Sequence, residues 1–220
     1  MTKTKLSQPV REIGIRSRSV TGIVPMFGHY ESTLERDMME IIRFDPNVQS
    51  FLPQPLTIEY RNNDGQKRSY TPDGLIHYKE TPGYLAPTLF EVKYRKDFRE
   101  QWKVFLPKFR AAKAYCIDRG WCFEVFTERE IRTPYLQNIK FLWPFRDRVS
   151  SLESSKLILI ALSGLKVADP NVLLGTLCHD ANDRAQMIPT LWHLISIGEI
   201  GCNLNEPLTM SSRIWTERWE

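Results

Sequence analysis

The chain has 220 residues, of which 42% are hydrophobic and 25% are charged, which is ordinary for a soluble globular protein that needs no disulfide or structural metal to hold its core. A net charge of +4 allows a nucleic-acid partner without requiring one. The longest apolar run, at 157–165, is too short to cross a bilayer, and the start lacks the apolar segment of a signal peptide. None of the four cysteines forms a CxxC pair, so we expect reduced thiols in a cytoplasmic protein.

Residues 1–28 are polar and basic, with five lysines or arginines against the single acid Glu12. Such a segment is either a frayed terminus or an arm that contacts a nucleic-acid backbone. A helix is predicted next, at 31–46, because its apolar residues recur with helical spacing and Pro46 stops it. Glu35 lies on the apolar side of this helix with Met38 and Ile42, where a carboxylate needs a partner. That partner is either a salt-bridging residue or a ligand.

Short strands then alternate with turns, and the segment 56–60 and the segment 68–71 flank an Asp64-Gly65 hairpin signal. Two more strands are predicted at 73–79 and 88–94, around a Pro/Gly-rich turn. A helix at about 98–118 follows and leads to a strand at 121–127, so the strands at 88–94 and 121–127 are expected to be parallel. The apolar face predicted for that helix consists of Trp102, Phe105, Leu106, Phe109, Ala112 and Cys116. Thr127 and Glu130 form a capping box for a further helix.

The pattern changes at 141–151, where we expect a domain boundary. Three apolar helical segments follow, and 199–212 has the character of a short hairpin or wing. This order is typical of a winged-helix domain, and an ordinary helical domain is the alternative. The predicted organisation is therefore an α/β domain with its basic arm at 1–148 and a small winged-helix-like domain at 149–220.

Three polar residues stand out on the second strand pair. Period 2 places Glu91 and Lys93 on one face of their strand, and Asp73 comes near them if the two strands pair. Two carboxylates and an ammonium group suit metal-assisted phosphodiester cleavage, in which Mg²⁺ or Mn²⁺ polarises the phosphate and Lys93 orients water or offsets charge. Glu35 would be a further ligand. A simple strand salt bridge explains an isolated Glu-x-Lys equally well.

The order of these features is more specific than any one of them. A helical glutamate, Pro72-Asp73 at a strand start, Glu91-x-Lys93 in an apolar strand and then a helix is the order of the PD-(D/E)xK nuclease core. Over about 31–140 the chain resembles the TnsA-type transposon endonucleases of that superfamily, notably in "YTPDGLIHY", "LFEVKY" and "FTEREIRTPYLQNI". The resemblance implies a restriction-endonuclease-like α/β fold with a mixed sheet flanked by helices. It implies a catalytic set of Glu35, Asp73, Glu91 and Lys93, with Mg²⁺ (or Mn²⁺) held by Glu35, Asp73 and Glu91.

The resemblance also implies partners. TnsA-type proteins cut the 5′ ends of a transposon in the bacterial cytoplasm, alongside a TnsB-type transposase and a TnsC-type AAA+ ATPase, and no membrane is involved. A run of basic residues beside the predicted site is either a solvated helix face or a surface for the phosphate backbone of transposon-end DNA. These residues are Arg95, Lys96, Arg99, Lys103, Arg110 and Lys113.

Two other functions remain open at this point. A restriction or repair endonuclease could use the same core and act alone on its own site. A DNA- or protein-binding adaptor could keep the fold without turnover, although the complete set of Glu35, Asp73, Glu91 and Lys93 argues against it. There is no phosphate-binding GxxxxGK[ST] loop, so any ATP hydrolysis is expected to belong to a partner.

Overall fold

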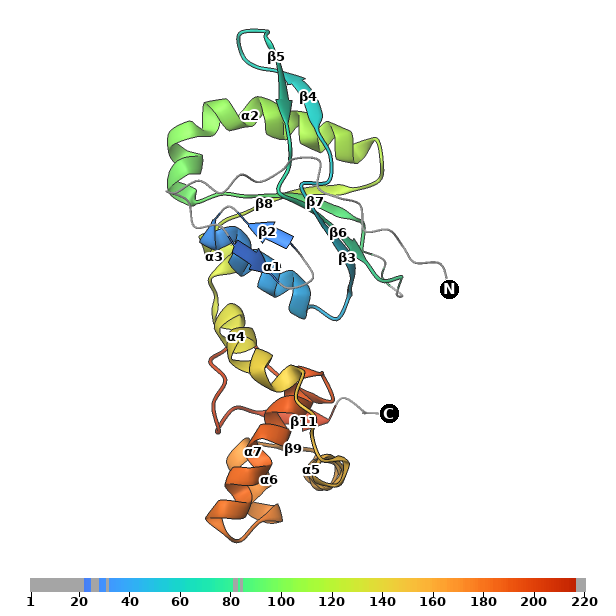
Figure 1. The fold of residues 1–220 in the computed structure, drawn as a ribbon, viewed down its shortest axis with the longest axis vertical. Helices are drawn as coiled ribbons and strands as arrows, with labels where there is room; N and C mark the ends of the chain where they lie inside the picture. The colour runs from blue at the N-terminus through green and yellow to red at the C-terminus, as the bar shows by residue number, and fades with distance from the viewer. Residues whose placement is uncertain (1–21, 25–27, 31, 81–82, 84, 217–220) are drawn as a thin grey trace. The chain divides into compact units, whose positions relative to one another are not determined.

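A computed structural model describes residues 22–24, 28–30, 32–80, 83 and 85–216, and it divides into two compact units, Met1–Ile131 and Arg132–Glu220 (Figure 1). The division falls ahead of helix α4 (Pro134–Arg146), whereas the sequence pattern places the boundary at 148/149. The basic residues predicted to form an N-terminal arm lie outside the described residues.

A four-stranded mixed sheet organises the first unit, in the order β3-β6-β7-β8. Its strands are β3 (Val48–Pro53), β6 (Gly74–Tyr78), β7 (Thr88–Val92) and β8 (Cys122–Phe126). The β3–β6 and β6–β7 pairs are antiparallel, and β7 runs parallel to β8 as the intervening helix predicts. Every residue of β7 is buried, so this central strand carries Glu91 into the interior.

Helices cover both faces of this sheet (Figure 1). Helix α1 (Thr33–Phe44) packs on one face, beside the small antiparallel pair β1 (Gly22–Val24) and β2 (Gly28–Tyr30). Helix α2 (Arg95–Ile117) packs on the other face, and the short helix α3 (Glu128–Ile131) follows β8. The glutamate of the predicted capping box is in place, since the Glu130 carboxylate accepts the backbone N–H of Thr127 at 3.0 Å.

The hairpin predicted around Asp64-Gly65 is confirmed. Strands β4 (Ile58–Arg61) and β5 (Lys67–Tyr70) pair in antiparallel fashion, and Gly65 adopts the positive φ of 77° that its turn requires. The side chains of Ile58 and Tyr70, on the hairpin, are buried in the hydrophobic core. They belong there to one cluster with Leu75 and Leu89 of the sheet and Ala112 and Cys116 of α2. The hairpin is thereby part of the same hydrophobic core as the sheet.

Helix α2 is irregular, and its irregularity ties it to the hairpin. Pro107 lies inside the helix and has no N–H to donate to the carbonyl of Lys103, four residues earlier. The side-chain amide of Asn63, in the β4–β5 turn, donates to that carbonyl instead, at 3.1 Å. This hydrogen bond lies at the surface, and it links the hairpin turn to α2 at the position where the proline leaves a carbonyl without its helical donor.

One prediction about the apolar face of α2 is wrong. Trp102 is 48% exposed, whereas Phe105, Ala112 and Cys116 are buried as predicted. The helix breaks directly before Trp102, at Gln101, whose φ and ψ of −119° and 15° are not helical. Trp102 is therefore the first residue of the second helical segment, and it precedes the residues that enter the core.

The second unit is largely helical with a small sheet. After α4 come α5 (Leu152–Leu165), α6 (Pro170–Leu177) and α7 (Ala181–Ser196), with a sheet of order β10-β11-β9 built from β9 (Val167–Ala168), β10 (Ile200–Cys202) and β11 (Ile214–Thr216). Its fully buried residues include Ile158, Leu173, Leu191 and Ile214. The three predicted helices are present, and the returning strand of the hairpin lies just beyond the segment in which it was expected. In the part of the chain that the structure describes, no helix has both the length and the hydropathy to cross a membrane.

Candidate active site

Asp73 is fixed at the point where β6 begins beside the end of β7. Its backbone N–H donates to the Phe90 carbonyl at 3.1 Å, and its Oδ2 accepts the backbone N–H of Val92 at 2.7 Å. The next residue is Gly74, and a Cβ there would lie 2.5 Å from the ring of Phe51. Glycine at 74 therefore allows the close packing that holds Asp73 against β7.

Glu91 and Lys93 meet Asp73 at the same place. The Lys93 Nζ lies 2.9 Å from Glu91 Oε1 and 4.0 Å from Asp73 Oδ2. The sequence spacing of two along β7 and the β6–β7 pairing together produce this arrangement. The structure thus brings these three side chains together at the carboxyl end of β7.

Two residues that the sequence analysis missed complete the surroundings of Glu91. The Tyr70 hydroxyl donates to Glu91 Oε2 at 2.7 Å, and Lys108 Nζ lies 3.0 Å from Glu91 Oε1. Lys108 also stands 4.6 Å from the centre of the Tyr70 ring and 5.1 Å from that of Phe109, a cation–π arrangement. Glu91 is only 2% exposed, and both oxygens of its carboxylate therefore have partners.

Glu35 approaches from α1. Ser32 caps that helix by accepting the Glu35 backbone N–H at 3.1 Å, which places Glu35 in the first turn. Glu35 and Asp73 line one small cavity of about 10 Å³, together with Gln54 and the apolar residues Met39, Phe51, Pro53, Phe90 and Val92. The cavity has room for about one water-sized sphere. Two carboxylates from different elements therefore face the same enclosed space.

The electrostatics follow from this crowding. Burial raises the pKa of the Asp73 carboxyl well above its ordinary value, and the nearby Glu91 and Glu35 raise it further, against the opposing effects of Lys93 and the Val92 N–H. Burial alone would lower the pKa of Lys93, but Asp73 and Glu91 outweigh it and raise that pKa. Burial and the neighbouring Glu91 also raise the pKa of the Tyr70 hydroxyl. Groups with perturbed pKa values beside a cavity are candidates for a functional site.

The donor atoms at this site suit a hard divalent cation. Carboxylate and amide oxygens are the ligands that Mg²⁺ and Mn²⁺ prefer, and Glu35, Asp73 and Gln54 supply these at the cavity. Glu91 is turned toward Tyr70 and the two lysines. Within the described ranges, no set of three His, Cys, Asp or Glu residues is arranged as a metal-ligand cluster.

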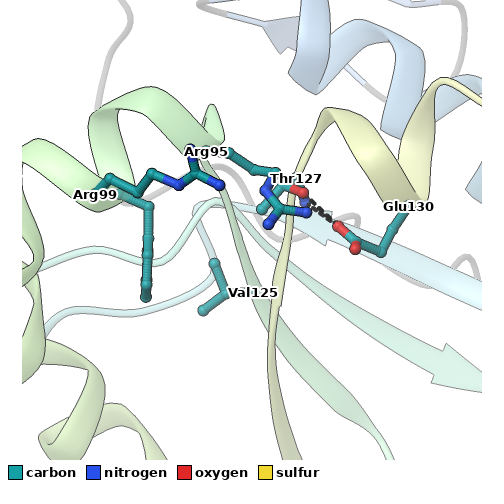
Figure 2. A pocket seen from close by; sticks show the side chains of 6 residues that line it. Arg95, Arg99, Val125, Thr127 and Glu130 are labelled. Atoms are coloured by element: carbon teal, nitrogen blue, oxygen red, sulfur yellow. Dashed lines mark hydrogen bonds between the residues drawn. The ribbon is translucent and has the colours of Figure 1, made fainter.

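A second, larger pocket of about 290 Å³ lies beyond the carboxyl ends of β7 and β8. It is lined by Arg95, Phe98 and Arg99 of α2 and by Val125, Thr127 and Glu130. Figure 2 shows the side chains of Arg95 and Arg99 at this pocket, with Thr127 hydrogen-bonded to Glu130. Guanidinium groups beside apolar side chains can bind a phosphate.

The other predicted backbone-contacting residues lie on the surface of α2. Lys96, Arg99, Lys103, Arg110 and Lys113 are all exposed, and Arg95 is half-buried. The bend at Gln101 separates Arg99 from the residues that follow. Basic residues thus lie at the pocket, as Arg95 and Arg99, and recur along α2 beyond the bend.

A comparison with protein families matches the part of the chain that holds most of these residues. Residues 45–128 match the family model described as "TnsA-like endonuclease N terminal", and no curated protein matches the chain. The match runs from the end of α1 to the start of α3, and it includes Asp73, Glu91 and Lys93 but not Glu35. Residues 45–128 are therefore a TnsA-like endonuclease N-terminal domain.

Proposed function

We propose that the chain is a metal-dependent DNA endonuclease subunit of a transposase, and that it cuts the 5′ ends of a transposon. The observation that carries this proposal is the meeting of Asp73, Glu91 and Lys93 at the end of β7, within a TnsA-like endonuclease domain. Glu35 adds a carboxylate at the cavity beside them. An oxygen-rich site next to a fixed ammonium group suits metal-assisted phosphodiester hydrolysis.

Each residue of the set has its own proposed role. Asp73 and Glu35 hold the divalent cation, Mg²⁺ or Mn²⁺, and Glu91 completes the ligands when its carboxylate exchanges an ammonium partner for the cation. The cation, when bound, polarises the phosphate and lowers the pKa of the attacking water. Lys93, already 4.0 Å from Asp73, positions that water or offsets the negative charge that develops on the phosphate.

The second unit is proposed to be a winged-helix-like module that docks a partner protein or DNA. Helices α5, α6 and α7 and the antiparallel sheet of order β10-β11-β9 support that assignment. Several large apolar side chains between 149 and 167 are exposed, notably Val149, Leu152 and Ile160. Contiguous exposed apolar residues are typical of a protein-binding surface. We propose a TnsB-type transposase and a TnsC-type AAA+ ATPase as the partners.

The test is cleavage of end-labelled DNA by the chain alone, and with the transposase and transposon-end DNA. We expect weak or no cutting by the chain alone, because phosphate contacts position DNA but carry no sequence information. Adding the transposase in Mg²⁺ should produce nicks at the 5′ ends, and EDTA should stop them. Efficient, sequence-specific double-strand cleavage by the chain alone would favour the restriction-enzyme function instead, and an absence of cutting under every condition would favour the adaptor.

The basic surface gives a separate prediction about DNA affinity. Replacing Arg99 and Lys103 together by glutamine should weaken binding to duplex DNA and reduce the slope of log affinity against log salt concentration by about 2, because each lost phosphate contact removes about 0.9 from that slope. Fluorescence anisotropy from 50 to 200 mM salt measures it. Lys79→Gln is the matched control, since Lys79 is exposed at the far end of β6 from Asp73. An equal slope in the double variant and the control would remove these residues from the DNA surface.

A further inference from the structure

Gln54 has an unusual backbone for its residue type. It follows the last residue of β3 and adopts a φ of 45°, in the left-handed region that favours glycine. A non-glycine residue in that region is strained, and such strain persists only where the surroundings enforce it. Here the Gln54 N–H donates to the carbonyl of Asp73 at 3.0 Å. The strained residue is therefore held directly beside the candidate active site.

The side chain of Gln54 is buried with its oxygen unsatisfied. The residue is 9% exposed, and its Oε1 has no hydrogen-bond partner among the residues that the structure describes. Leaving a buried amide oxygen unpaired is unfavourable, because the oxygen loses its hydrogen bonds to water. Gln54 lines the cavity of about 10 Å³ that Glu35 and Asp73 also line. Two independent energetic costs thus fall on one residue at this cavity.

The chemistry of the cavity identifies what would satisfy that oxygen. An amide oxygen accepts hydrogen bonds and ligates cations but donates nothing, and ionised carboxylates have the same property. The remaining lining residues are apolar or proline. Three side chains that carry oxygen atoms border this space, which has the size of one water, and they attract a cation. Hard divalent cations accept neutral amide oxygens as ligands.

We propose that Gln54 supplies its Oε1 as a ligand to the divalent cation that Glu35 and Asp73 hold. The strained backbone at the end of β3 aims this oxygen into the cavity, and the hydrogen bond to Asp73 keeps it in register with the carboxylate. This inference rests on the proposed metal-dependent function and adds a residue to its site. The neutral ligand fills a coordination position without adding a further negative charge to those of Glu35, Asp73 and Glu91.

The test is the affinity of the full chain for Mn²⁺, measured by the loss of the free-ion electron paramagnetic resonance signal in the presence of duplex DNA. Gln54→Met removes the oxygen at similar volume and should weaken Mn²⁺ binding tenfold or more. It should not lower the melting temperature in EDTA, because it also removes an unsatisfied buried polar atom. Gln54→Glu keeps an oxygen at the same place and should retain or strengthen Mn²⁺ binding.

The outcomes separate the two proposals. If the wild-type chain binds no Mn²⁺, the metal-dependent function fails. If the wild type binds Mn²⁺ and Asp73→Asn abolishes that binding while Gln54→Met binds as the wild type does, only the role of Gln54 fails. If Gln54→Glu loses Mn²⁺ binding as severely as Gln54→Met, Gln54 acts by donating a hydrogen bond to a carboxylate, and the assignment of its oxygen as a ligand is overturned.

Discussion

Replacing Asp73 by asparagine is expected to reduce DNA cleavage by about a thousandfold or more. In the absence of metal, the variant should be at least as stable as the wild type. The loss of activity follows from removing a carboxylate beside Glu35, Glu91 and Lys93. The amide oxygen of asparagine can still accept the Val92 N–H that Asp73 accepts at 2.7 Å, so the local fold is retained.

The effect on stability has a defined pH dependence. An acid whose pKa is raised in the folded state binds more protons when folded than when unfolded, so its ionisation destabilises the fold as pH rises above about 4 and through the raised pKa. In EDTA, Asp73→Asn should therefore melt at or above the wild-type temperature at pH 8, and the difference should shrink at pH 5. Added Mg²⁺ should stabilise the wild type and not the variant.

Glu59→Gln is the matched control for Asp73→Asn, because Glu59 is an exposed acid on β4. It should cut DNA as the wild type does and melt at the same temperature. Calorimetry measures the melting temperature, and the end-labelled assay measures DNA cleavage. Wild-type cleavage by Asp73→Asn would remove Asp73 from the catalytic set, and a large loss of stability would show that its role is structural.

Lys108→Met is expected to give the largest loss of stability. Lys108 lies 3.0 Å from Glu91, whose carboxylate is 2% exposed, and removing one partner of a buried ion pair costs about 3–5 kcal/mol. Because Lys93 remains 2.9 Å from the same oxygen, we expect a loss of unfolding free energy at the lower end of that range, about 3 kcal/mol. That corresponds to a fall of roughly 10 °C in the melting temperature of the first unit.

Two further variants identify the cause of that loss. Lys113→Met removes an exposed lysine from the same helix and should change the melting temperature little. Adding Glu91→Gln to Lys108→Met should recover part of the stability, because it removes the charge left without this partner. Equal losses in Lys108→Met and Lys113→Met would show that the contact with Glu91 contributes nothing measurable.

Local patterns in the sequence predicted much of the sheet. The Asp64-Gly65 turn, the strands around Asp73 and Glu91, and the parallel β7–β8 pair all follow from turn residues, alternation and the intervening helix. Strand β3 was missed, because its burial does not alternate and its last residue is a proline. Trp102 was misplaced, because the sequence does not show the break at Gln101 that makes it the first residue of a helical segment.

The missed residues at the site share a different cause. Tyr70 and Lys108 reach Glu91 from positions 21 and 17 residues away in the chain, on elements that meet only in the folded core. Nothing in their own neighbourhoods marks them, and Lys108 looks like one more basic residue of α2. Gln54 carries a local signal, since it stands between two prolines, but its strained φ and unsatisfied oxygen appear only in three dimensions.

The pairing of Glu91 with two lysines has a thermodynamic consequence for the whole site. With all groups ionised, the three carboxylates Glu35, Asp73 and Glu91 exceed the ammonium groups of Lys93 and Lys108 by one negative charge. One divalent cation would reverse that excess to one positive charge, which equals the charge of a single phosphodiester in magnitude. Metal and DNA should therefore bind with positive cooperativity, and by reciprocity DNA should raise the affinity for Mg²⁺ by the same factor as Mg²⁺ raises the affinity for DNA.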